Sequence, residues 1–237
     1  MSTEDFWNNI YTKHKTSFPN EDDAVLLEAF RHFGGDVSGA KLLDLGCGDG
    51  STSLFFAQKG ANVVAIDISE AAIKGLSQFC QENQINNITP RQCSAFDILE
   101  LGSFDFVFGN MILHHLEPFE EFAKILRKSI APDGKAFFHE NSAFSDLLVW
   151  FRNNLVGKYG IPKYGDDEEF PVTPQEVESL RRNFIVNIVY PELVFFRLAS
   201  FYLLKGHLSG WLTQLDEYLF KFPSFRKYSY RQYLLLS

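Results

Sequence analysis

LLDLGCGDG, at Leu42–Gly50, is the stretch that decides the fold. An apolar run that gives way to three alternate glycines predicts a buried β-strand ending in a tight loop, where the backbone can approach a ligand closely. A second apolar run, Val63–Ile66, ends in Asp67, whose carboxylate can accept hydrogen bonds from both hydroxyls of a ribose. The two strand ends together predict a binding site for a nucleoside cofactor.

The glycine spacing narrows the choice of cofactor. A dinucleotide fingerprint reads GxGxxG, whereas this loop reads GCGDG over residues 46–50, and Asp49 would repel a phosphate. A GxxxxGK[ST] phosphate loop is also excluded, because Ser51 rather than lysine follows Gly50. A cofactor without phosphates therefore fits better.

These motifs resemble those of the class I S-adenosylmethionine-dependent methyltransferases, and the resemblance covers about residues 40–140. It implies S-adenosyl-L-methionine as cofactor, with Asp67 on the ribose and Asp44 ordering the loop that receives the amino-acid end. A purely structural role for Asp44 and a helix-capping role for Asp67 stay open. The cofactor-binding candidates are Asp44, Gly46, Cys47, Gly48, Asp67, Ile68, Ser94, Ala95, Phe96, Asn110 and Met111.

The next two strand ends supply the adenine and methionine contacts. The family usually presents an acid to adenine at the third strand, but here Ser94 takes that place, so Ser94 or Asp97 is the contact and Ser94 is preferred. Asn110 follows the predicted strand 104–108 and is expected beside the methionine part. The Pro-Pro signature of nucleobase amino-methyltransferases is missing there, which favours a small-molecule acceptor.

Candidate catalytic residues lie at the same edge of the predicted sheet. His115 and His114 follow the fourth strand, and a histidine is suited to remove a proton from an acceptor at neutral pH. His115 is preferred, and a structural role for both stays open. Glu140, which ends the fifth strand, could orient a histidine or bind an acceptor amine, and Asn141 is the alternative as a helix N-cap.

The composition is typical of one compact protein, and its charge argues against a nucleic-acid partner. The chain has 237 residues, 46% of them apolar, and a net charge of −8 that offers no basic stripe to a phosphate backbone. Its three cysteines lack CxxC spacing, so neither a disulfide framework nor a metal site is expected. No signal peptide is recognised at the start, and a cytoplasmic location is expected.

Alternating apolar runs and helical segments predict an α/β fold. The expected architecture is a doubly wound, Rossmann-like, seven-stranded sheet, mostly parallel with an antiparallel last strand, in a single domain over 1–237. Its parts are an N-terminal helical lid (1–38), a cofactor-binding core (39–145), and a C-terminal part (146–237) with a substrate loop, the sixth strand, a helical insertion and the last strand. Glycines and charges over 157–169 predict that this loop is mobile.

Local signals place several boundaries. Asn20 is predicted to cap the helix that carries Phe30, and Gly34 is predicted to end it. A turn over 132–134 is predicted to close the helix at about 118–130. Thr173 is predicted to open a later helix through a capping box.

The segment 193–222 predicts an inserted helical pair with an apolar face too short to span a bilayer. A cap over an apolar substrate is preferred, while a dimer interface and a shallow membrane contact stay open. The sequence thus predicts a methyltransferase acting on an oxygen or nitrogen of a small, partly apolar molecule. The alternatives are a non-catalytic S-adenosylmethionine-binding protein and a nicotinamide-dependent oxidoreductase.

Overall fold

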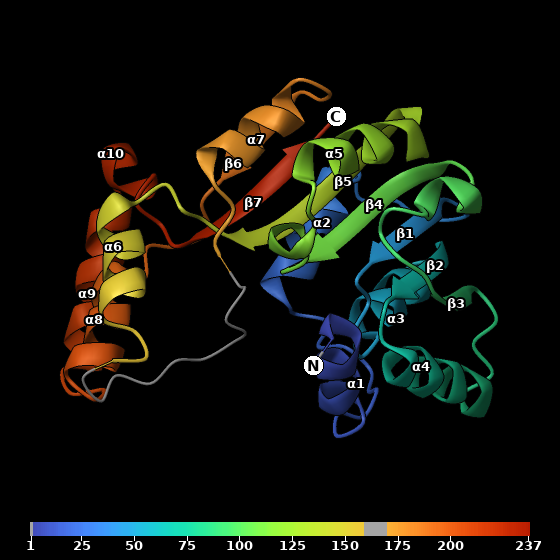
Figure 1. The fold of residues 1–237 in the computed structure, drawn as a ribbon, viewed down its shortest axis with the longest axis horizontal. Helices are drawn as coiled ribbons and strands as arrows, with labels where there is room; N and C mark the ends of the chain where they lie inside the picture. The colour runs from blue at the N-terminus through green and yellow to red at the C-terminus, as the bar shows by residue number, and fades with distance from the viewer. Residues whose placement is uncertain (1, 159–169) are drawn as a thin grey trace.

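A seven-stranded sheet forms the centre of the computed structural model, which describes residues 2–158 and 170–237 (Figure 1). The strand order is β3-β2-β1-β4-β5-β7-β6, and β7 runs antiparallel to both of its neighbours. The expected doubly wound sheet with an antiparallel last strand is therefore confirmed. The strands are β1 (Lys41–Leu45), β2 (Asn62–Asp67), β3 (Ile88–Gln92), β4 (Phe104–Asn110), β5 (Ile130–Asn141), β6 (Val186–Val189) and β7 (Arg231–Leu236).

Helices cover both faces of the sheet, and a further group lies beyond its edge (Figure 1). In Figure 1 the helices α6, α8, α9 and α10 gather on one side of the molecule, away from α1 and α4. The α-helices are α1 (Thr3–Tyr11), α2 (Ala24–His32), α3 (Ser51–Gln58), α4 (Glu70–Glu82), α5 (Phe119–Ser129), α6 (Asp146–Asn154), α7 (Pro174–Arg181), α8 (Phe195–Leu203), α9 (Ser209–Phe220) and α10 (Pro223–Arg226). Two short 3-10 helices, η1 (Ile98–Leu101) and η2 (Leu113–His115), complete the described elements.

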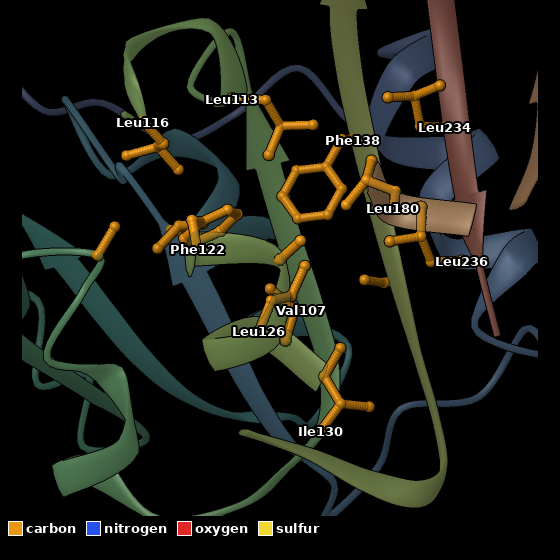
Figure 2. Packing of buried hydrophobic residues seen from close by; sticks show 14 of the residues in the cluster. Val107, Leu113, Leu116, Phe122, Leu126, Ile130, Phe138, Leu180, Leu234 and Leu236 are labelled. Atoms are coloured by element: carbon orange, nitrogen blue, oxygen red, sulfur yellow. The ribbon is translucent and has the colours of Figure 1, made fainter. Parts of the chain in front are cut away.

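Two apolar cores lie on opposite faces of the sheet, because successive strand residues point to opposite sides. On one face Val107 and Phe138 pack against Phe122 of α5 and Leu180 of α7, as Figure 2 shows. On the other face Phe108 belongs to the cluster that includes the phenylalanines of α3. Burial on both faces explains why these strands read as unbroken apolar runs.

Two predicted boundaries were wrong, and one alternative that the sequence left open is excluded. The N-cap of α2 is Asp23, not Asn20: the Asp23 carboxylate accepts hydrogen bonds from the first-turn amides, while Asn20 forms a turn with Asp22. Asn141 does not cap a helix, because the chain stays extended to that residue and Ser145 caps α6. The turn over 132–134 lies inside the irregular start of β5, where the pairing with β4 shifts register.

The inserted helices are confirmed, and α9 caps α8. Asp216 of α9 is buried, and its carboxylate accepts hydrogen bonds from the amides of Phe196 (3.0 Å) and Arg197 (2.8 Å) at the start of α8. The sequence did not predict the flanking helices α6 and α10. The capping box at Thr173 is present. Residues 159–169, most of the predicted loop, lie outside the described residues.

Candidate functional site

A cavity of about 440 Å³ opens at the carboxyl ends of β1, β2 and β4. In this strand order β1 is flanked by β2 and β4, so the chain reverses direction of winding there, which is where open α/β sheets bind their ligands. The predicted site residues that line the cavity are Gly46, Asp67, Ile68, Ser94, Ala95, Phe96, Asn110, Met111 and His115. Five others are absent from its lining: Asp44, Cys47, Gly48, His114 and Glu140.

Glycine is required at two positions of the loop after β1. Gly46 and Gly48 have φ values of 71° and 53°, in the left-handed region that side chains disfavour. A Cβ atom on Gly48 would lie 2.6 Å from the Tyr11 hydroxyl, and one on Gly46 would lie 2.9 Å from Ile112. The loop therefore presents bare backbone to the cavity at Gly46, and Tyr11 packs against it at Gly48.

Asp67 joins the glycine loop to the end of β2. Its carboxylate accepts hydrogen bonds from the amides of Gly48 (2.9 Å) and Ser69 (2.8 Å), and it also lines the cavity. Burial raises its pKa, while these amide hydrogen bonds oppose the rise. The N-cap of α4 is Ser69, so capping does not account for Asp67.

Asp44 lies behind the cavity. It is 1% exposed, and one of its carboxylate oxygens accepts a 2.6 Å hydrogen bond from the Ser53 hydroxyl of α3. Burial raises its pKa to about 7, against the effect of Ser53. Asp44 thus ties β1 to α3 beneath the glycine loop.

The acids give the loop a negative electrostatic environment. Burial first, and then the charges of Asp67, Asp49 and Asp44, raise the pKa of Tyr11. Burial and the same acids raise the pKa of the Cys47 thiol well above its ordinary value. Such a field opposes a pyrophosphate and suits a ligand with cationic sulfonium and ammonium groups. The bare loop, Asp67 and this field fit S-adenosylmethionine.

Helix α1 lies against the cavity. Trp7 and Tyr11 stack with ring centroids 5.9 Å apart, and both residues line the cavity. The Asn8 side-chain oxygen accepts hydrogen bonds from the Ser69 hydroxyl (2.8 Å) and the Ala71 amide (3.1 Å), which fasten α1 to the start of α4. The role of Asn8 was not predicted, because a lone polar residue in a helix carries no local sequence signal of its partner.

The end of β3 forms a turn at the cavity wall. The Ser94 hydroxyl accepts a hydrogen bond from the Phe96 amide at 3.2 Å. Asp97, the alternative adenine contact, is exposed and does not line the cavity. Of the two, Ser94 therefore has the position that an adenine contact requires.

Glu140 holds the loop after β4 in place by accepting hydrogen bonds from its amides. Its side chain is fully buried and accepts hydrogen bonds from the amides of Ile112 (2.7 Å) and Leu113 (2.6 Å) and pairs with His114 Nδ1 at 2.8 Å. The His114 side chain is itself 4% exposed. His115 instead lines the cavity, with its ring centroid 5.7 Å from that of Trp7.

Two polar contacts lie where β4, β5 and β7 meet. The Asn110 side-chain oxygen is 2.9 Å from His139 Nδ1. Burial first, and then the charge of Arg231, lower the pKa of His139 to about 4, so this ring is neutral at pH 7. Arg231 Nη1 donates to the sulfur of Met111 at 3.4 Å. The sequence analysis missed Arg231, although a cation that opens an apolar terminal strand is a signal that could have been used.

A glycine loop after β1, an acid after β2 and this strand order define the class I S-adenosylmethionine-dependent methyltransferase fold. The chain belongs to the methyltransferase-domain family, whose sequence profile matches residues 20–166. The cofactor of this class is S-adenosylmethionine.

Curated relatives include O-methyltransferases of ubiquinone biosynthesis. The protein from Acinetobacter baylyi is 30% identical over 109 residues, a match to 45% of each chain. The mitochondrial protein from Bos taurus is 27% identical over 166 residues, which cover 67% of this chain and 44% of the relative. The chain thus spans less than half the length of these relatives.

Solved structures share the fold. Geranyl diphosphate C-methyltransferase from Streptomyces coelicolor aligns with a TM-score of 0.61 and 14% identity over 98% of this chain and 94% of its own. The [4+2]-cyclase SpnF aligns with a TM-score of 0.57 and 15% identity over 94% of this chain and 85% of its own. At these identities the likeness concerns the fold alone.

Proposed function

We propose that this protein transfers a methyl group from S-adenosylmethionine to an oxygen or nitrogen of a small, partly apolar acceptor. The observation that carries the proposal is one cavity that combines the bare glycine loop and Asp67 with Asn110, Met111 and His115. The O-methyltransferase names of the curated relatives favour oxygen over nitrogen.

The cofactor side of the cavity has the groups that such a ligand needs. In the proposal Asp67 holds the ribose hydroxyls, Ser94 and Phe96 contact the adenine, and the backbone around Gly46 receives the amino-acid end. Bound there, S-adenosylmethionine supplies an electrophilic methyl group on a sulfonium. The aromatic faces of α1 exclude water and attract the cationic centre.

His115 is the proposed general base. A hydroxyl or ammonium acceptor must lose a proton on methylation, and His115 lines the cavity, whereas His114 is buried against Glu140. Asn110 and Met111 line the same cavity and would contact the methionine part of the cofactor. Aligning the nucleophile, the methyl group and the sulfur contributes most to the rate of an in-line displacement. General-base catalysis therefore adds a moderate factor to that rate.

Product formation tests the proposal. The protein is incubated with S-adenosylmethionine and a panel of phenols, alcohols and amines, and S-adenosylhomocysteine is measured by mass spectrometry. His115→Ala is expected to lower turnover about 10²-fold without changing cofactor affinity. His207→Ala, an exposed histidine between α8 and α9, is the control. Tight cofactor binding with no product from any acceptor would instead identify a non-catalytic binding protein.

Isothermal titration tests the cofactor half separately. Asp67→Ala is expected to weaken S-adenosylmethionine binding by about 1–3 kcal/mol, the range of hydrogen bonds to charged groups. Asp97→Ala, an exposed acid after the neighbouring strand, should leave the affinity unchanged. Equal affinities for Asp67→Ala and the wild type would remove Asp67 from the ribose site.

A further inference from the structure

A second cavity, of about 500 Å³, lies between α6 and α8. Its size is that of a pocket for a small organic ligand. Leu148 and Phe151 of α6 face Leu198 and Ala199 of α8, and the rings of Phe151 and Tyr202 are 5.9 Å apart. The lining is mainly aliphatic and aromatic, so the ligand that it suits has a flexible apolar body.

Consecutive contacts connect this cavity to the cofactor cavity. Tyr230 lines the α6–α8 cavity, and its hydroxyl accepts a 3.0 Å hydrogen bond from Arg152 of α6. The next residue, Arg231, donates to Met111, which lines the cofactor cavity. Tyr230 and Arg231, adjacent at the start of β7, thus contact the linings of the two cavities.

A cation with an incomplete set of partners lies at the start of β7. Arg231 is half-buried, and among the described residues its side chain has no carboxylate within ion-pair distance and one hydrogen bond, to the weak acceptor sulfur of Met111. Its strand neighbour Asn141 has a buried side-chain oxygen without a hydrogen-bond partner in the described structure. Buried polar groups are normally satisfied, so the orphaned Asn141 oxygen points to a ligand group that donates a hydrogen bond, such as a hydroxyl. The half-buried guanidinium of Arg231 can donate to the oxygen of the same group.

We infer that the methyl acceptor is an amphiphile with an aliphatic chain and an ionisable oxygen. The chain occupies the α6–α8 cavity, and Arg231 binds the oxygen-bearing head beside Met111. This inference rests on the proposed function and names its substrate class. A guanidinium is a strong hydrogen-bond donor to a carboxylate or phenolate. The apolar walls bind a longer aliphatic chain more tightly, because more apolar surface is buried.

A chain-length series tests the inference without requiring catalysis. Hexanoate, octanoate, decanoate and dodecanoate are titrated calorimetrically into the 237-residue protein. Each buried methylene contributes about 0.8 kcal/mol, so the Kd should fall about fourfold per methylene until the cavity is filled. A Kd that does not depend on chain length would overturn the inference.

Variants on both walls identify the site. Ala199→Trp on α8 and Leu148→Trp on α6 should each abolish the dependence on chain length, and Leu204→Trp, at the exposed end of α8 outside the cavity, should preserve it. Circular dichroism and the melting temperature verify folding, and the two walls give independent readings. Chain-length dependence that survives in both folded wall variants would also overturn the inference.

Arg231 is tested through the head group. Arg231→Gln should weaken all four carboxylates by a similar factor of about 10, and Arg231→Lys should recover part of the loss. Unchanged affinities in Arg231→Gln would contradict its role. S-adenosylmethionine binding and methyl transfer to short acceptors are measured in parallel on the wild type. If both are intact while the carboxylates show no dependence of Kd on chain length, the inference is rejected and the proposed function stands.

Discussion

Asp44 makes the stability of this protein depend on pH. Burial raises its pKa from an ordinary value of 3.8 to about 7, so the folded state holds the proton more tightly than the unfolded chain does. The stability contribution of Asp44 is therefore full below about pH 4 and is lost as the pH rises to about 7. Asp44→Asn cannot lose a proton, yet its amide oxygen can still accept from Ser53.

The free energy of unfolding of Asp44→Asn relative to the wild type should thus increase from pH 4 to pH 7 and level off above. Urea denaturation of the ligand-free proteins across this range measures it, and subtraction removes the contribution of other titrating groups. A difference that is flat with pH would show that Asp44 keeps an ordinary pKa in the fold.

Glu140 stabilises the fold through the amides it binds. Replacement by Ala leaves the buried amides of Ile112 and Leu113 without an acceptor, which costs about 1–3 kcal/mol each. Glu140→Ala should therefore lower the free energy of unfolding by about 2–6 kcal/mol, and Glu140→Gln, which keeps one carbonyl oxygen, should lower it less. Equal losses in the two variants would mean that the charged carboxylate, which both variants lack, and not amide binding, is what Glu140 supplies.

At the scale of elements, Asn8 fastens α1 to the start of α4. Asn8 binds the start of α4 through its amide oxygen, while the neighbouring Asn9 is exposed. Asn8→Ala should detach α1, increase hydrogen exchange of its amides and weaken S-adenosylmethionine binding severalfold, since α1 carries Trp7 and Tyr11 over the cavity.

Asn9→Ala is the matched control, with the same substitution one residue along the same helix. Exchange and affinity should stay at the wild-type level in this variant. If Asn8→Ala also leaves the cofactor affinity unchanged, α1 makes no contribution to the bound state.

The strands and most of the covering helices were predictable, but the contacts between elements were not, for a physical reason. Apolar runs such as 63–66 carry their own burial signal, because the strand is covered on both faces by whatever helices follow. The position of Glu140 against Ile112, 28 residues earlier, depends on strand pairing that no local pattern records. The sequence likewise does not tell which of two adjacent histidines faces the cavity. His114 pairs with buried Glu140, while His115 lines the cavity.

For the whole molecule, the proposed cofactor site, the proposed base His115 and the apolar cavity lie at the carboxyl ends of the strands. The carboxyl ends of β1, β2 and β4 form the cofactor cavity, and the chain leaves β5 toward α6 and returns from α10 into β7. Helix α6 of the second cavity thus follows β5, which pairs with β4 of the first. Among the described residues, no helix combines the length and the apolar character needed to cross a membrane.

Ligand binding should therefore stabilise the molecule as a unit. S-adenosylhomocysteine at 100 times its Kd adds about 2.7 kcal/mol to the free energy of unfolding, which corresponds to a rise in Tm of about 5–10 °C for a chain of this length. Differential scanning fluorimetry measures the shift. NAD at the same concentration should leave Tm unchanged, because the acids around the glycine loop repel its pyrophosphate, and Asp67→Ala should need more S-adenosylhomocysteine for the same rise. A shift with NAD and none with S-adenosylhomocysteine would contradict the cofactor assignment, since the protein would then hold a dinucleotide at the same strand ends.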